Sequence, residues 1–72
     1  MSREEDLKKL QNMENGDNVL INWFEEGGAD VYMVNYHFIV FYCGQYGGDC
    51  NFEAAFNWAE PEKVIELAYS WT

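Results

Sequence analysis

The chain has 72 residues, of which 49% are hydrophobic and 18% aromatic, and 13 acids against 4 bases give a formal net charge of −9. This length allows one hydrophobic core, so we expect a single domain over residues 1–72. A disordered acidic tail is excluded because such segments are poor in aromatic residues. A strongly negative protein also repels nucleic acid and anionic membranes, so direct binding to either is not expected.

The first segment, "SREEDLKKLQNMENG" (residues 2–16), is predicted to form a helix. Ser2 and Glu5 have the spacing of a capping box, in which each side chain can bind an amide of the first turn. Leu7 and Leu10 give the helix one narrow apolar stripe, which needs another element to cover. The N-terminus is charged and lacks the apolar stretch of a secretory signal, so we expect a cytoplasmic protein.

Residues 18–44 are predicted to form two strands of an antiparallel sheet. The first runs through "NVLINWF", and Gly27 and Gly28 in "EEGGAD" supply the turn. The second strand contains the uncharged stretch "VYMVNYHFIVFYCG" from Val31 to Gly44. Fourteen extended residues would span about 46 Å, so we expect a bend or bulge in it.

The last two segments each allow two interpretations. "CNFEAAFNWAE" fits a strand or a helix, and the tight turn before it favours a strand. "EPEKVIELAYSWT" has Pro61 where a helix would start, although its apolar residues also alternate as in a strand. The sequence therefore predicts an α+β fold with a three-stranded antiparallel meander flanked by N- and C-terminal helices (α-β-β-β-α). The alternative is α-β-β-α-β.

The long central strand has apolar residues on both faces. One face carries Tyr32, Val34, Tyr36, Phe38, Val40 and Tyr42, and the other carries Val31, Met33, Asn35, His37, Ile39, Phe41 and Cys43. Two helices with few apolar residues can cover one face only. Either the sheet curls so that Trp23, Trp58 or a helix covers the second face, or that face binds a partner or a second copy.

Acidic residues are expected to gather at one end of the three-stranded meander. The first turn holds Glu25, Glu26 and Asp30, and the third strand returns to the same end with Glu60 and Glu62. Solubility and helix-end electrostatics explain such residues separately, but together they would repel one another. A cluster of this kind suits a basic groove that normally holds the backbone of a nucleic acid.

The sequence gives little support for catalysis. On one strand, His37 and Cys43 would lie about 20 Å apart, beyond hydrogen-bond reach, so only Cys50 could partner His37. A zinc site from His37, Cys43, Asp49 and Cys50 has the wrong spacing for the familiar fingers, so we expect no metal and no cofactor. The two cysteines could face each other across a turn, but in the cytosol we expect them to be reduced. His37 would instead make binding sensitive to pH.

The chain resembles the small acidic inhibitor proteins of bacteriophages and other mobile elements, anti-CRISPR proteins in particular. The resemblance lies in the single compact α/β domain, the absence of Lys and Arg from Leu10 to Glu62, and the ending "EPEKVIELAYSWT". It implies a protein that blocks a nucleic-acid-binding enzyme, in several cases by imitating the charge pattern of DNA. No functional residue is carried over from that group.

Our first hypothesis is therefore a non-enzymatic inhibitor that binds a basic nucleic-acid-binding protein, such as a CRISPR effector. The residues expected to contact it are Glu25, Glu26, Asp30, Glu60, Tyr36, His37 and Phe41. The second hypothesis is a homodimeric adaptor or structural module that pairs through its apolar sheet face.

Overall fold

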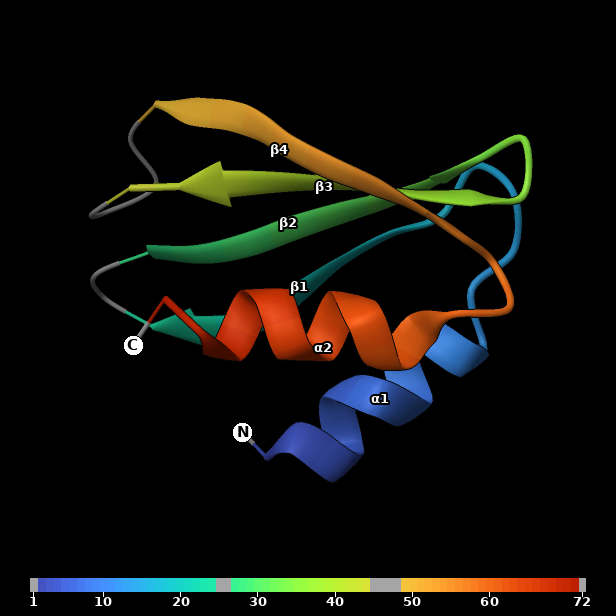
Figure 1. The fold of residues 1–72 in the computed structure, drawn as a ribbon, viewed down its shortest axis with the longest axis horizontal. Helices are drawn as coiled ribbons and strands as arrows, with labels where there is room; N and C mark the ends of the chain where they lie inside the picture. The colour runs from blue at the N-terminus through green and yellow to red at the C-terminus, as the bar shows by residue number, and fades with distance from the viewer. Residues whose placement is uncertain (1, 25–26, 45–48, 72) are drawn as a thin grey trace.

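The computed structural model describes residues 2–24, 27–44 and 49–71 and shows two helices packed on an antiparallel sheet (Figure 1). In chain order the elements are α1 (Arg3–Gln11), β1 (Asn18–Phe24), β2 (Gly27–Val34), β3 (His37–Cys43), β4 (Cys50–Asn57) and α2 (Pro61–Tyr69). The α+β class and the two flanking helices are confirmed. The predicted strand at residues 50–57 and the helix starting at Pro61 are also confirmed. Within the described residues, however, the sheet has four strands rather than three.

The additional strand arises because the stretch from Val31 to Gly44 is a hairpin and not one long strand. Asn35 and Tyr36 both have positive φ, of 50° and 62°, and Val34 pairs with His37 across them. Two central residues with positive φ form the tight turn that suits the twist of a hairpin. The usual sequence signal is Asn-Gly or Asp-Gly, so a tyrosine at the second position concealed this turn.

The sheet is a simple meander with strand order β1-β2-β3-β4, and both helices lie on the same side of it (Figure 1). The core fills the space between these two layers. Its fully or almost fully buried hydrophobic residues are Leu10, Ile21, Ala29, Val31, Met33, Phe38, Val40, Val64, Ile65 and Ala68. The sheet therefore has one face packed against helices and one face without them.

A buried carboxylate joins the two helices to the first strand. Asp6 in α1 is fully buried, and its Oδ2 accepts hydrogen bonds from the Asn22 amide (2.9 Å) and the Tyr69 hydroxyl (2.6 Å). Its Oδ1 lies 3.7 Å from Lys9 Nζ, which supplies a counter-charge. Asn22 has a φ of 50° at a bulge in β1, and its side chain donates to Ala68 O in α2. Because this network joins three elements, it fixes how α1 and α2 sit on the sheet.

The helix ends follow the sequence signals. Ser2 caps α1 by accepting a hydrogen bond from the Glu5 amide at 3.2 Å, as its capping-box spacing predicts. The helix ends at Gln11, before the end of the predicted segment. Gly16 lies beyond the helix, and its amide donates to Met33 O at 2.8 Å. Neither helix in the described part of the chain is long and apolar enough to cross a membrane.

Candidate functional site

The sheet face without helices is formed by apolar side chains from all four strands. Paired residues in an antiparallel sheet point to the same side, and the pairs Tyr32–Ile39, Asp30–Phe41 and Phe41–Phe52 define this one. We call it the open face; its apolar members are Leu20, Tyr32, Val34, Ile39, Phe41 and Phe52.

The open face differs from both faces that the sequence predicted. The Asn35–Tyr36 turn reverses the chain between β2 and β3. Tyr32 on β2 therefore shares a face with Ile39 and Phe41 on β3 rather than with Phe38. Met33, which was expected beside Ile39 on the second face, is buried in the core with 4% exposure. The sequence left open whether the second sheet face is covered. In the structure one face lacks a covering helix, but its residues differ from the predicted set.

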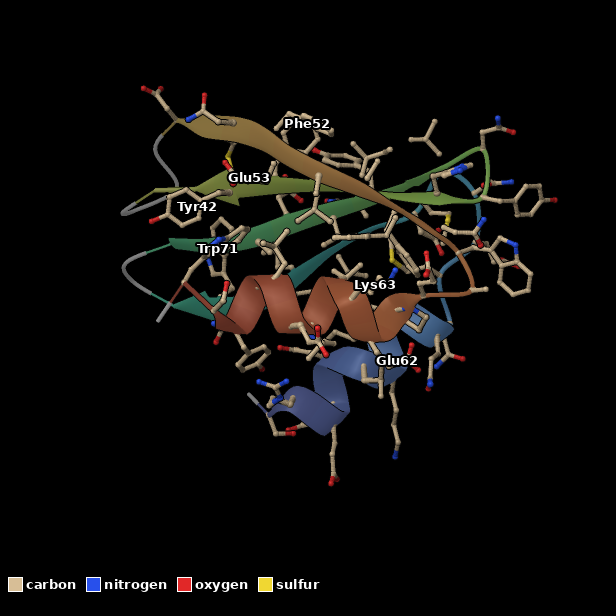
Figure 2. The ribbon with its side chains drawn as sticks, in the orientation of Figure 1. Tyr42, Phe52, Glu53, Glu62, Lys63 and Trp71 are labelled. Carbon is tan, nitrogen blue, oxygen red and sulfur yellow. A yellow bond between two sulfur atoms is a disulfide. The ribbon has the colours of Figure 1, made fainter. Side chains whose placement is uncertain are left out.

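The aromatic residues of the open face pack edge to face but remain accessible. The Phe41 ring lies 5.7 Å from that of Tyr32 and 6.1 Å from that of Phe52, both in T-shaped geometry. Phe52 is 59% exposed and Val34 54% exposed. Figure 2 shows Phe52 on β4 away from the helices, whereas Trp71 lies beside Tyr42 on the helix side with ring centroids 4.8 Å apart. Exposed apolar groups gathered in this way are typical of a protein-binding surface.

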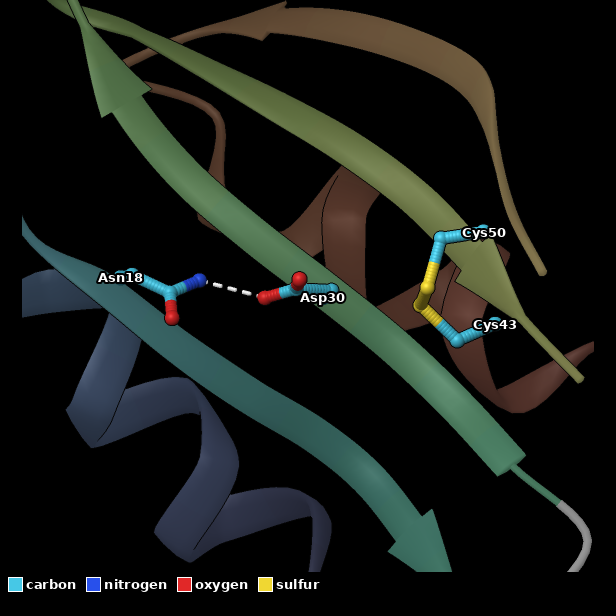
Figure 3. The surroundings of a disulfide bond; sticks show 4 residues. All are labelled: Asn18, Asp30, Cys43 and Cys50. Carbon is cyan, nitrogen blue, oxygen red and sulfur yellow. Dashed lines mark hydrogen bonds between the residues drawn. A yellow bond between two sulfur atoms is a disulfide. The ribbon is translucent and has the colours of Figure 1, made fainter. Parts of the chain in front are cut away.

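Asp30 places a negative charge in the middle of the open face. It lies on β2, between Leu20 on one neighbouring strand and Phe41 on the other. Asn18 donates a side-chain hydrogen bond to its carboxylate (Figure 3). The charge of Asp30, and then the hydrogen bond that its carboxylate accepts from the phenol, raise the pKa of Tyr32 above its ordinary value. A shallow hollow of about 450 Å³ lies over Asp30, Tyr32, Val34, Ile39, Phe41 and Cys50.

The predicted cluster of acids at one end of the sheet is wrong for the residues that the structure describes. With four strands, β4 finishes at the end opposite to Phe24 and Gly27, so Glu60 lies far from the first turn (Figure 1). Asp30 is at neither end, because it pairs in the middle of the sheet. Glu25 and Glu26 lie outside the described residues.

Glu60 is also neutralised locally. Its carboxylate forms an ion pair of 2.8 Å with Lys63, one turn further along α2. The hydrogen bond from Lys63 is the largest cause that lowers the pKa of Glu60. The residue therefore stabilises the start of the helix and offers little free charge to a partner.

The remaining predicted contact residues separate into two groups. Phe41 lies at the centre of the open face, and His37 lies at its margin, where it pairs with Val34. The His37 ring is exposed, with Nδ1 2.8 Å from Asn35 O. Tyr36 lies in the turn beyond the sheet and is 61% exposed. The structure thus brings Asp30, His37 and Phe41 onto one face and leaves Tyr36 at the end of the sheet.

Sequence reasoning missed Leu20, Val34 and Phe52 as members of this surface. In a regular strand Phe52 would share a face with Ala54, but a bulge between them shifts the register of β4, so Phe52 points to the open face. No local sequence signal marks a bulge at this place. Leu20 and Val34 alternate with core residues in their strands, and that alternation is the signal that would have found them.

The expectation of reduced cysteines is overturned by a disulfide between Cys43 and Cys50 (Figure 3). The register of β3 and β4 pairs these residues directly, with Cα atoms 4.0 Å apart. The bond closes the end of the hairpin beside the open face. It also removes both thiols of the chain as nucleophiles or zinc ligands while it is intact.

The charges of the chain are divided between its two layers. The helices contain all four basic residues, which are Arg3, Lys8, Lys9 and Lys63, and five of the thirteen acids. The strands and connecting segments contain the other eight acids and no lysine or arginine. Because the helices cover the opposite side of the sheet, the open face has no basic residue to compensate Asp30.

No protein-family model matches the chain, and no curated protein or solved structure is significantly similar to it.

Proposed function

We propose that this protein is a non-enzymatic inhibitor that binds through its open face to a basic, nucleic-acid-binding surface of a host defence enzyme, in the manner of an anti-CRISPR protein. The single observation that supports this most is the exposed apolar face with an uncompensated carboxylate, Asp30, at its centre. Aromatic residues at the centre of an interface supply most of its affinity, because they exclude water from a large area.

The charge of this surface favours a basic partner. With a net charge of −9 and no base on the sheet, the protein attracts cationic surfaces over long distances and accelerates encounter with them. Short-range affinity then comes from Tyr32, Phe41 and Phe52. This mode of binding differs from a close imitation of DNA, which would require a regular row of carboxylates instead of one central Asp30.

The test adds the protein to a panel of purified CRISPR effector complexes and measures their binding of target DNA by mobility shift at low and moderate salt. We expect the wild-type protein to displace DNA from at least one effector, and less effectively as salt screens the charges. Phe52→Asp should weaken this inhibition by at least about tenfold, because it replaces an exposed aromatic side chain of the interface with a second charge.

Lys8→Gln is the matched control, because it lowers the net charge by the same single unit on the exposed surface of α1. It should inhibit like the wild type. The proposal is wrong if no effector loses its DNA, or if Phe52→Asp and Lys8→Gln inhibit equally well.

A second candidate function, a homodimeric adaptor, is supported by the same exposed apolar face. Its weakness is that two copies would bring two Asp30 carboxylates and two net charges of −9 together. Sedimentation at high protein concentration distinguishes the candidates. A dimer that Phe52→Asp dissociates would support the adaptor, whereas a monomer at both low and high salt would eliminate it.

A further inference from the structure

A second hollow lies at the end of the sheet, outside the open face. It has a volume of about 390 Å³, within the roughly 300–1,000 Å³ of small-ligand pockets. Two aromatic residues, Tyr36 and Trp58, line it, and Leu10, Met13 and Met33 provide apolar contacts. Leu10 and Met33 belong to the core between the sheet and the helices, and Leu10 and Gln11 belong to α1, so this pocket, which we call the end pocket, lies next to that helix.

The backbone around the end pocket is held by hydrogen bonds. The Tyr36 amide donates to Asn15 Oδ1 at 2.8 Å, and the Trp58 amide donates to Tyr36 O at 2.9 Å. The Gly16 amide donates to Met33 O at 2.8 Å, which ties the segment after α1 to β2. Three separate parts of the chain are therefore fixed around the pocket before any ligand arrives, which lowers the entropic cost of binding.

Tyr36 occupies a position where the fold by itself favours glycine. Its φ of 62° is uncommon for a bulky residue, and the second central position of such a turn is usually Gly. The side chain gains little from burial, because the residue is 61% exposed. Residues kept in unfavourable backbone conformations cluster at functional sites. A tyrosine at this position contributes to the lining of the end pocket.

The chemistry of the lining is that of a cation site. The faces of tyrosine and tryptophan attract cations, and Glu14 adds a carboxylate at the rim. The two remaining lining residues, Gln11 and Asn15, carry amide oxygens, of which Asn15 Oδ1 already accepts from the Tyr36 amide, and the lining contains no base. A guanidinium group matches this set better than an alkylated ammonium, because it stacks on aromatic rings and also donates hydrogen bonds in a planar fork.

We propose that the end pocket binds the guanidinium group of an arginine side chain, presented by a protein partner between Tyr36 and Trp58 and paired with Glu14. This inference rests on the pocket alone and does not depend on the proposed function of the open face. The two can therefore fail separately, and a small ligand is sufficient to test this one.

The test is a titration of the isotope-labelled protein with N-acetyl-arginine methylamide, followed by NMR. The matched ligand is N-acetyl-citrulline methylamide, which has nearly the same shape and no charge. We expect saturable shifts of the Trp58 indole N–H and the Tyr36 amide at millimolar arginine, with citrulline at least about tenfold weaker because it lacks the cation. Trp58→Ala, at a 58% exposed position, should abolish saturation without unfolding the protein.

Glu14→Gln should weaken arginine binding by roughly three- to tenfold, since it removes the charge that pairs with the guanidinium group. Glu4→Gln makes the same change at an exposed position of α1 that does not line the pocket, and it should bind like the wild type. Equal shifts with citrulline and arginine, or arginine shifts that are unchanged in Trp58→Ala, would overturn the proposal. So would the absence of shifts up to the solubility limit of the ligand.

Discussion

Removing the hydroxyl of Tyr69 tests whether the buried Asp6 network holds the helices on the sheet. Tyr69→Phe deletes the 2.6 Å hydrogen bond to Asp6 but leaves the ring in place, with Arg3 4.9 Å from its centroid. A hydrogen bond to a charged group contributes about 1.5–3 kcal/mol, so we expect a loss of about 2 kcal/mol. A chain of this length has a total stability of roughly 4–11 kcal/mol, so the loss is a substantial fraction.

The assay is urea unfolding followed by circular dichroism, with the slope of the transition as the check that the folded state is unchanged. In thermal unfolding the same loss should lower Tm by about 8–16 °C. Tyr36→Phe is the control, since it removes a hydroxyl from an exposed tyrosine and should stay within about 0.5 kcal/mol of the wild type. If Tyr69→Phe is no less stable than this control, the Asp6 network does not hold the helices as we argue.

The same network makes stability depend on pH in the alkaline range. Burial, and then the hydrogen bond to Asp6, raise the pKa of Tyr69 from 10.0 to about 12. The folded protein therefore binds this proton more tightly than the unfolded chain does. The resulting stabilisation is complete below the unfolded pKa of 10.0 and is lost as the pH rises through about 12. Over this interval the free energy of unfolding should fall more for the wild type than for Tyr69→Phe. An equal dependence on pH in the two proteins would contradict the raised pKa of Tyr69.

Three further predictions follow from local geometry. Gly27→Ala should prevent folding, because the added Cβ would lie 2.0 Å from Cys43 O and the residue has a φ of +107°. Gly16 also has a positive φ, of +93°, but has open space around it. Gly16→Ala should therefore lower the free energy of unfolding by only about 1–2 kcal/mol in urea unfolding. Similar losses in the two variants would refute this. The oxidised protein should show no free thiol in a colorimetric assay, and reactive thiols in the absence of reductant would disprove the disulfide. Replacing Cys43 and Cys50 by Ser should lower the free energy of unfolding by about 2–3 kcal/mol, as expected for so short a loop. Tyr36→Gly should raise the free energy of unfolding by up to about 1–2 kcal/mol in urea unfolding and should abolish arginine binding. A variant that is less stable than the wild type, or that still binds arginine, would count against the role of Tyr36.

Local signals in the sequence were sufficient for the element types and for the division of charge. The Ser2 cap and Pro61 at the start of α2 act through neighbouring backbone groups, so they can be read without the fold. The tight turn before Cys50 favoured a strand at β4 for a similar reason. The absence of bases from Leu10 to Glu62 already implied that the sheet would carry uncompensated acids.

The tertiary structure decided where those elements and charges lie. The left-handed turn at Asn35 and Tyr36 has no strong sequence signal, and the side-chain and backbone contacts that hold it come from Asn15 and Trp58, distant in sequence. One undetected reversal sends every later strand in the opposite direction, which moved Glu60 to the other end of the sheet. The bulge that exposes Phe52 likewise depends on the pairing of whole strands. Each of these features is fixed by contacts between segments far apart in the chain, so no short stretch of sequence contains them.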